Sequence, residues 1–545
     1  MLLELAQRHG IEAGYHDIWG TWHALSTDTA QALLGAVGVD ASSEAELVQG
    51  LADCEERPWL EFAPSVVVNR DEQPCEVMLT INACHDQCLV RWWIECEDGA
   101  RVSGEQQCAQ LEVRDQRARH GTTLRRCRLA LPDELSHGYH RLHIEVADHK
   151  AVVALIRTPA RCANVVDERV WGLCVQLYGL RSTSNWGIGD FGDLRLAIQI
   201  FAARGADFVG LNPLHALYLD TPSHISPYSP SSREHTNALY LHIESMADYA
   251  DCESARAMVE AVEFQATLAS LRQCELVDYV GVAACKRRVF ECLFEYFAQA
   301  HFDIDTGTAR SARGHEFAMF CDVRGEDLRR YAVFETLHEH FGHSHDDGQA
   351  WHVEYRAARG AADSPEIAQF VASHGRRIAY FQYLQWQCET QLTSCREHAS
   401  NAGMRIGLYL DLAVGSDGHG ADVCSEPENY AARVSIGAPT DDFALQGQVW
   451  GLPPLRTDRL RDAAYDPFIR CLRANMCHAG ALRIDHVLGL LRLFWVPDGG
   501  GATDGAYVHY PVNDLLAITA LESTRAQCVV VGEDLGTVPD AMREA

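Results

Sequence analysis

The chain has 545 residues, enough for two to four domains of ordinary size. It carries 46 Lys and Arg residues against 76 Asp and Glu residues, a formal net charge of −30, which argues against nucleic acid or an anionic membrane as a partner. Hydrophobic residues make up 47% of the chain and charged residues 22%, so we expect a folded globular protein.

The sequence shows no targeting segment. No apolar run approaches the roughly 20 residues that a membrane-spanning helix needs, and Met1–Gly10 contains charged residues without a signal-peptide pattern. We therefore expect the 20 cysteines to be reduced thiols in a cytoplasmic protein. Cys84 and Cys88 lack the second pair of ligands that would complete a zinc site.

The first 160 residues divide into a helical part and a β-rich part. The periodicity of residues 1–60 predicts helices, including one over Thr27–Val37 with Asp28 as its cap. In residues 61–160, turn residues separate short β-rich runs, which is typical of an antiparallel β-sandwich. The predicted strands are Ser65–Asn69, Glu76–Asn82, Cys88–Cys96, Thr122–Ala130, Arg141–Ala147 and Ala151–Arg157.

Residues 165–545 follow an α/β pattern. Trp171–Leu177 is a predicted strand, a helix starts at Asp193, and a second strand covers Asp207–Asn212, which together make one β-α-β unit of a parallel sheet. Residues 250–400 are predicted as an inserted helical subdomain. The β/α alternation then returns, and the further predicted strands are Met404–Asp411, Ala481–His486 and Cys528–Asp534. We predict a multidomain α/β protein whose catalytic domain is a β/α barrel.

Arg483 and Asp485 are the most informative charged residues of the predicted sheet. They lie two apart in a strand, so their side chains share one face, whereas a buried parallel strand is normally apolar on both faces. Two charges there are costly unless they are paired or functional. A core salt bridge is the alternative interpretation, but the next predicted strand also ends in charged residues.

That next strand ends in Glu533 and Asp534, and one βα unit separates it from Asp485. The carboxyl ends of neighbouring strands are where a β/α barrel holds its reactive groups. Two carboxylates that face one cleft can act as acid/base and nucleophile at a glycosidic bond. An Arg beside the nucleophile would keep it ionised.

Several longer segments give the chain a specific resemblance. They are Leu177–Ser182, Asn185–Leu194, Gly210–Leu217, Ser226–Arg233, Gly437–Pro439, Trp450–Pro454, Ala481–His486 and Gly532–Gly536. In this order they resemble the 4-α-glucanotransferases (amylomaltases or disproportionating enzymes) of glycoside hydrolase family 77, in the long bacterial form. The resemblance covers the chain from its N-terminal region to its last residue.

The resemblance implies a role for the three charged residues of the two strands. Asp485 would be the nucleophile that forms a β-glycosyl-enzyme, Glu533 the general acid/base, and Arg483 the group that orients and ionises Asp485.

It also implies substrate-binding residues. Asp411 would lie near the donor sugar, and Asp441 in a mobile loop over the acceptor subsites. Tyr228 and Trp450 would pack their rings on the apolar faces of glucose units. His486 follows the nucleophile in the family pattern, although in a continued strand its side chain would point away from Asp485, and a packing role is the alternative.

The activity implied is 4-α-glucanotransfer by a retaining double displacement. A segment of a 1,4-α-glucan, such as maltodextrin, starch or glycogen, would pass to the 4-hydroxyl of another glucan or of glucose. The two carboxylates suffice for this chemistry, so neither a cofactor nor a metal is expected.

The sequence departs from the family pattern at its C-terminal end. The family has a third catalytic aspartate in a later His-Asp segment, and no matching segment precedes Ala545. Only five barrel strands are predicted where a closed barrel needs eight. We therefore expect a truncated form with low or absent activity. Thr440 replaces a second proline of the family and is expected to loosen the acceptor loop slightly.

Alternatives to transfer remain open at this point. The chain could be an inactive maltodextrin-binding fragment or an α-glucan hydrolase. Gly187–Gly192 matches a dinucleotide-binding pattern, but a polar loop precedes it and no acidic residue closes the next strand, which argues against a dehydrogenase. His338, His340, His343 and His345 are interpreted as a histidine-rich polar loop and not a metal site.

Overall fold

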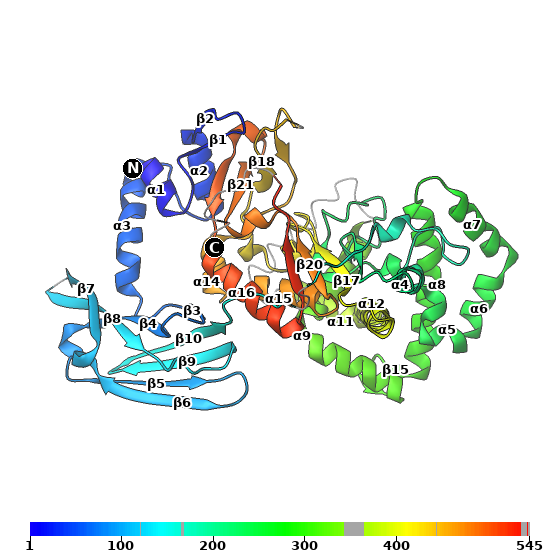
Figure 1. Cartoon of the computed structure of the whole chain (residues 1–545), viewed down its shortest axis with the longest axis horizontal. Helices are drawn as coiled ribbons and strands as arrows, with labels where there is room; N and C mark the ends of the chain where they lie inside the picture. The colour runs from blue at the N-terminus through cyan, green and yellow to red at the C-terminus, as the bar shows by residue number, and fades with distance from the viewer. Residues whose placement is uncertain (120, 165–167, 343–364, 443, 536–541, 543–545) are drawn as a thin grey trace.

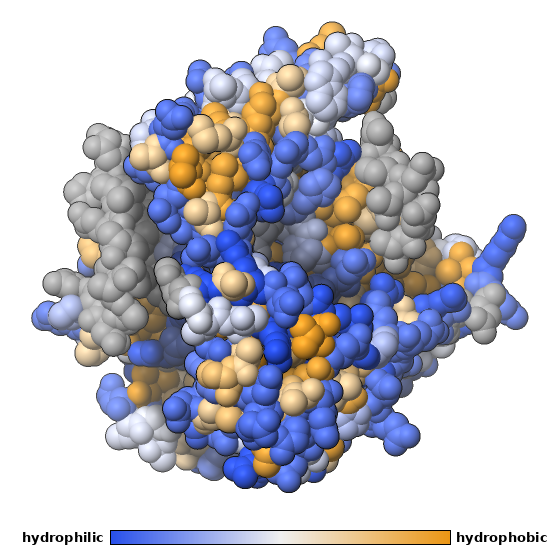
Figure 2. Space-filling view, turned by 90° about the vertical axis from the view of Figure 1, so that its left-hand side faces the viewer, coloured by the Kyte–Doolittle hydropathy of each residue, from blue (hydrophilic) through white to orange (hydrophobic). Residues whose placement is uncertain are grey.

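The structure is a computed structural model that describes residues 1–119, 121–164, 168–342, 365–442, 444–535 and 542. Strands between residues 66 and 158 occupy one end of the molecule, and helices between residues 247 and 300 occupy the other (Figure 1). A parallel sheet lies between them. On the face at the strand-rich end, hydrophilic residues cover most of the surface and apolar residues form separate groups (Figure 2).

The N-terminal 60 residues form three helices and one short antiparallel pair of strands. The elements are α1 (Leu2–Arg8), β1 (Gly14–His16), β2 (Trp22–Ala24), α2 (Thr27–Ala36) and α3 (Glu44–Leu60). Ser26, and not the predicted Asp28, caps α2, because its side chain accepts a hydrogen bond from Thr29 N. Ser43 and Glu46 form a capping box at the start of α3.

Residues 66–158 form two sheets. One sheet has the order β3 (Val66–Arg70), β10 (His149–Thr158), β9 (Gly138–Val146), β5 (Leu89–Glu95), β6 (Arg101–Gln107), and the other β4 (Glu76–Asn82), β8 (Thr122–Ala130), β7 (Glu112–Arg119). Alternate residues of β4 are buried, and Leu79 packs in one apolar cluster with Ile94 of β5 and Leu142 of β9. All pairs are antiparallel except β3 with β10. The strands β6 and β7 were not predicted.

The central sheet is parallel and has five strands in the described part of the chain. Its order is β11 (Gly172–Val175), β12 (Phe208–Leu211), β17 (Gly407–Leu412), β20 (Ala481–Ile484), β23 (Val529–Gly532). Four of them lie inside the predicted strands, and β17 ends one residue beyond the predicted Met404–Asp411. The helix between the first two, α4 (Phe191–Ala202), begins two residues before the predicted start, because Asp190 and Asp193 form a capping box there.

The two faces of this sheet differ in chemistry. Val209, Leu408 and Leu482 point to one face and are fully buried in the large apolar core. The neighbouring residues in each strand point to the opposite face, where Tyr409 and Arg483 lie. The apolar face fixes the register, because a slip of one residue would bury the charged side chains.

Most of the described residues between 247 and 401 are helical, in the interval for which the sequence predicts an insertion. The elements are α5 (Ala247–Asp251), α6 (Glu253–Glu260), α7 (Val262–Gln273), α8 (Tyr279–Ala300), β15 (Phe302–Asp303), β16 (Thr308–Ala309), α9 (Ala312–Gly342), α11 (Pro365–Ser373) and α12 (Gly375–Asn401). Helix α12 packs against α4 and α9 and leads directly into β17. It therefore connects the helical region to the parallel sheet. The helix α9 contains His338 and His340, so the predicted histidine-rich loop is wrong for these two residues, and His343 and His345 lie outside the described residues.

A second, four-stranded sheet was not predicted from the sequence. Its order is β19 (Gln448–Val449), β18 (Val434–Ala438), β21 (Arg492–Pro497), β22 (Ala506–His509). The N-terminal segment docks on it, since Ile11 forms a β-bridge with Val508 and Tyr15 packs edge-on against Phe494. The N-terminal helices and β1 and β2 lie beside this sheet in Figure 1. The remaining elements are β13 (His215–Ala216), β14 (Ser232–Thr236), α13 (Ala421–Ser425), α14 (Thr457–Asp462), α15 (Asp466–Met476) and α16 (Val512–Ala526).

Two whole-chain expectations can be compared with this architecture. All 20 cysteines are free, as expected for reduced thiols. Among the helices of the described ranges, none has both the length and the apolar character that a membrane crossing requires.

Candidate active site

Asp485 and Glu533 lie at the carboxyl ends of two directly paired strands. Residues Ile484 and Gly532 are partners in the register of β20 and β23, and the two carboxylate residues follow them immediately. The backbone continues this pairing, because Glu533 N donates to Ile484 O at 3.0 Å and Val487 N donates to Glu533 O at 3.0 Å. The prediction that these strand ends are neighbours is confirmed.

Arg483 bridges two carboxylates. Its guanidinium donates from one NH2 group to Asp411 Oδ1 and from the other to Asp485 Oδ1, both at 2.6 Å. Asp411 is the partner of Arg483 in the register of β17 and β20, and Asp485 lies two residues further along the same face. The planar fork of Arg suits this arrangement, because its donors point in fixed directions. The Arg483 side chain therefore fixes both carboxylates relative to the sheet.

Tyr228 adds a second contact to Asp411. Its hydroxyl donates to Asp411 Oδ2 at 2.8 Å, so both oxygens of this carboxylate are used. Tyr228 lies between β13 and β14 and is 41% exposed, whereas the Asp411 side chain is only 7% exposed. An open aromatic side chain thus stands over a buried carboxylate.

Burial dominates the electrostatics of this cluster. Burial raises the pKa of Asp485 above its ordinary value, Arg483 opposes that rise, and the neighbouring Glu533 adds to it. Burial also raises the pKa of Asp411, against the opposing effect of Arg483 and Tyr228. The guanidinium thus favours the ionised form of Asp485, but the effect of burial on its pKa is larger.

Backbone donors hold the carboxylate of Glu533. His486 N donates to Oε2 at 2.9 Å and Leu535 N donates to Oε1 at 2.8 Å. His486 can donate in this way because its backbone is left-handed (φ 49°), which ends the extended run directly after Asp485. Each carboxylate oxygen of Glu533 therefore has one fixed backbone donor.

The turn at His486 also places its ring against Trp450. The two rings meet edge to face with their centroids 5.6 Å apart. Burial lowers the pKa of His486, although Glu533 and Asp485 act in the opposite direction. The strand does not continue through His486, so its side chain does not follow the alternation that the sequence suggested.

Asp441 lies in the loop between β18 and β19, which are strands of the four-stranded sheet. Its carboxylate accepts a 2.6 Å hydrogen bond from Ala444 N within that loop. Of the predicted site residues, the structure joins Tyr228, Asp411, Arg483 and Asp485 through hydrogen bonds, and joins Glu533, His486 and Trp450 through the adjacent turn.

A cavity of about 320 Å³ opens beside this cluster. Besides Tyr228, Asp411 and Arg483, its lining includes Gln176 and Asn212, which sequence reasoning did not single out as site residues. Both lie inside predicted strands and directly follow the observed strands β11 and β12, and the polar Asn212 interrupts an apolar run, which was a usable signal. Asn212 accepts a 2.7 Å hydrogen bond from Leu177 N and thereby ties the ends of β11 and β12 together.

A second missed group supports the loop after β17. Buried His215 accepts a 3.1 Å hydrogen bond from Ala413 N, and burial lowers its pKa to about 3, so the ring is neutral. Arg233 donates to the carbonyl oxygens of Ala413 and Val414 at 3.1 and 3.0 Å. These bonds hold the backbone that follows Asp411. The site as a whole provides two neighbouring carboxylates, Asp485 and Glu533, and a cation, Arg483, that pairs with Asp485 and lines the cavity. Such a set of groups can perform acid/base and nucleophilic catalysis.

Comparisons with known proteins match most of this chain to one family. A family model described as 4-alpha-glucanotransferase matches residues 175–545, and one described as the MalQ N-terminal beta sandwich domain matches residues 63–159. The chain is similar to the 4-alpha-glucanotransferase of Haemophilus influenzae, with 40% identity over 420 residues that cover 76% of this chain and 59% of that protein. It is also similar to that of Mycobacterium tuberculosis, with 35% identity over 554 residues that cover all of this chain and 73% of that protein.

Solved structures show the same likeness. The amylomaltase of Corynebacterium glutamicum superposes with a TM-score of 0.84 at 29% identity, covering all of this chain and 73% of that chain. An amylomaltase of Streptococcus agalactiae in complex with acarbose has a TM-score of 0.55 at 20% identity, covering 69% of this chain and 71% of that chain, which shows a shared fold. The match thus spans 59% of the Haemophilus protein, and 73% of both the Mycobacterium protein and the Corynebacterium structure.

Proposed function

Because the chain belongs to the 4-alpha-glucanotransferase family, as its sequence predicted, we propose that it transfers a segment of a 1,4-α-glucan to the 4-hydroxyl of an acceptor. The donors are maltodextrins and related glucans, and the acceptors are other glucans or glucose. The observation that carries this proposal is the pairing of Asp485 and Glu533 at adjacent strand ends, with Arg483 bound to Asp485.

The proposed reaction is a double displacement with retention. In the first step, an Asp485 carboxylate oxygen attacks the anomeric carbon of the donor, the glycosidic C–O bond breaks, and Glu533 gives its proton to the departing oxygen. In the second step, Glu533 takes the proton of the acceptor 4-hydroxyl, whose oxygen displaces Asp485 from the anomeric carbon. Both carboxyl groups return to their initial state, so the two carboxyl groups suffice for the reaction.

The different hydrogen-bond partners of Asp485 and Glu533 support different roles for the two carboxyl groups. Asp485 accepts from a guanidinium, which favours the ionised nucleophile even though burial raises the pKa of its carboxyl. Glu533 accepts from two neutral backbone amides, which position its carboxylate. Different environments for two carboxyl groups are the usual basis for different roles.

Substrate contacts are proposed from the same geometry. Exposed Tyr228 and half-buried Trp450 are suited to pack on sugar rings, and the tightly held Asp411 to accept hydrogen bonds from donor hydroxyls. His486, next to Trp450, and Asp441, in the loop after β18, are proposed on the acceptor side. The structural neighbour in complex with acarbose supports an oligosaccharide as the ligand.

We extend the proposal to the organisation of the chain. Residues 1–60 form a helical N-terminal segment, residues 61–160 a β-sandwich domain, and residues 165–545 a catalytic domain of the β/α-barrel type with a helical insertion at about 250–400. The five parallel strands and their sequential order support the barrel type. The 20 free cysteines support a reducing compartment, the cytoplasm, as the location.

The product pattern from maltotriose tests the activity. We expect glucose together with maltodextrins longer than maltotriose, and no products from Asp485→Asn. Products that are only shorter than maltotriose would instead identify a hydrolase. Retained binding of maltotriose without any product would identify a glucan-binding protein, and either result would overturn the proposed transfer.

A further inference from the structure

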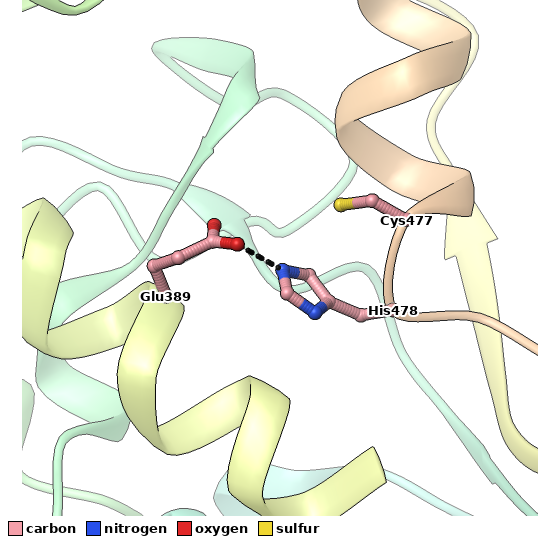
Figure 3. Close-up of side chains that lie close together, drawn as sticks. All are labelled: Glu389, Cys477 and His478. Atoms are coloured by element: carbon pink, nitrogen blue, oxygen red, sulfur yellow. Dashed lines mark ion pairs between the residues drawn. The ribbon is translucent and has the colours of Figure 1, made fainter. Parts of the chain in front are cut away.

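Three potential metal ligands meet at the start of β20, away from the candidate active site. Glu389 lies on α12, and Cys477 and His478 directly follow α15 (Figure 3). His478 precedes β20 by three residues, whereas Asp485 follows the opposite end of this strand. The side chains of this cluster point toward one another in Figure 3.

The geometry of the cluster is close to that of a metal site. The three ligand atoms all lie within 4.8 Å of one another, and His478 Nε2 is 3.1 Å from Glu389 Oε1. Ligand atoms bound at about 2.0–2.3 Å in a tetrahedral site are separated by about 3.3–3.8 Å. Small side-chain rotations would therefore let one ion contact all three atoms. Among the described residues, this is the one group of three such side chains found at that spacing.

The donor types and their burial favour a borderline-soft ion. A thiolate, an imidazole nitrogen and a carboxylate oxygen together are typical ligands of Zn²⁺ and poor ligands of Mg²⁺ or Ca²⁺. The His478 side chain is 7% exposed, so its orientation is held by packing, while Cys477 is exposed and offers an entry path. A water molecule can complete the coordination from the exposed side.

Two arginines border the cluster, but neither donates a hydrogen bond to one of the three ligand atoms. Arg324 approaches Glu389 Oε2 at 3.8 Å, beyond hydrogen-bond distance, whereas Oε1 is the atom that faces His478. Arg396 donates to the backbone oxygen of Cys477 and not to its thiol. The Cys477 thiol donates a weak hydrogen bond to Ala474 O at 3.3 Å and also bonds with the His478 side chain.

We propose that Glu389, Cys477 and His478 bind Zn²⁺ and thereby fasten α12 to the segment that leads into β20. On binding, the thiol proton of Cys477 and any proton on His478 pass to solvent, and the metal takes the place of the direct contact between His478 and Glu389. The ion is structural, since it lies at the other end of the strand from Asp485 and takes no part in glycosyl transfer. The proposal is independent of the proposed function.

Cobalt absorption tests the site in a chain with many other thiols. We expect Co²⁺ added to the metal-free full chain to produce a thiolate-to-cobalt charge-transfer band and tetrahedral visible bands at one equivalent. Cys477→Ser should abolish the band, and Zn²⁺ should displace the cobalt. Cys84→Ser, which removes another exposed thiol, should leave the band unchanged.

Thermal stability provides a second readout. Zn²⁺ in excess of its dissociation constant should raise the melting temperature of the wild-type chain by at least about 2 °C, and this rise should vanish in Cys477→Ser and in Glu389→Gln. Because Cys477 is exposed, its replacement by Ser should not disturb the packing of the chain. The test therefore does not need a variant of the buried His478, which could misfold. A cobalt band and a zinc-induced shift that persist in Cys477→Ser would overturn the proposal.

Discussion

Replacing Arg483 by Met tests whether the guanidinium offsets the burial of two carboxylates. Met keeps most of the apolar length of the side chain but removes both 2.6 Å hydrogen bonds, to Asp411 and to Asp485. Each hydrogen bond to a charged group contributes about 1.5–3 kcal/mol. The Arg483 side chain is 27% exposed, so water replaces part of this interaction, and we expect a loss of about 2–4 kcal/mol at pH 7.

The loss should depend on pH in a defined direction. Burial already raises the pKa of Asp411 and Asp485, and without the guanidinium both values rise further. A carboxyl whose pKa is raised by folding contributes stability that is complete below its unfolded pKa and is lost as the pH rises through its folded pKa. The cost of Arg483→Met should therefore be small below about pH 4 and complete at pH 7.

Urea unfolding followed by tryptophan fluorescence at pH 4 and at pH 7 measures this difference. Arg141→Met is a matched control, because Arg141 is 71% exposed and pairs with Glu95 on the sandwich surface, where an ion pair contributes less than about 1 kcal/mol. A cost for Arg483→Met that equals the control, or that is the same at both pH values, would refute the reasoning.

Three further changes probe the nucleophile, the core and a helix cap. Asp485→Asn should reduce transfer at least about 10³-fold. It should also raise the melting temperature at pH 7, because burial raises the pKa of this carboxyl and its ionised form therefore lowers stability. This gain should disappear near pH 4, and a lower melting temperature of the variant at pH 7 would contradict the prediction. Leu482→Ala should lower the free energy of unfolding in urea by about 2–5 kcal/mol, since Leu482 is fully buried. Leu276→Ala, at an 81% exposed position, should lower it little, and equal effects of the two substitutions would count against the assigned core. Ser43→Ala should lower the free energy of unfolding by about 0.5–2 kcal/mol, because it removes the capping box of α3. Thermal unfolding followed by circular dichroism measures this difference, and an unchanged transition would exclude a stabilising role for the cap.

The sequence determined the elements whose burial pattern is simple. The strands of the parallel sheet are short apolar runs, and α4 has an apolar stripe, so their local sequences suffice to place them within a few residues. The same local signal was absent in β6 and β7, whose side chains are mostly polar and exposed, and these strands exist because β5 and β8 supply their hydrogen-bond partners. Pairing of this kind is a tertiary property and leaves little trace in a single strand.

The chemistry of the candidate site divides in the same way. Arg483 and Asp485 could be identified as candidate site residues from the sequence, because they place two charges on one face of a predicted strand that is otherwise apolar. The alternation of side chains along a strand is a local rule and needs no tertiary information. That Arg483 reaches Asp411 depends on the register of β17 with β20, and the direction of the pKa shift of Asp485 depends on how deeply the folded chain buries it. The cluster of Glu389 with Cys477 and His478 had no sequence signal, since its members lie on segments far apart in the chain. The alternation of side chains along a strand depends only on neighbouring residues. Register, desolvation and contacts between distant segments arise only when the whole chain has packed.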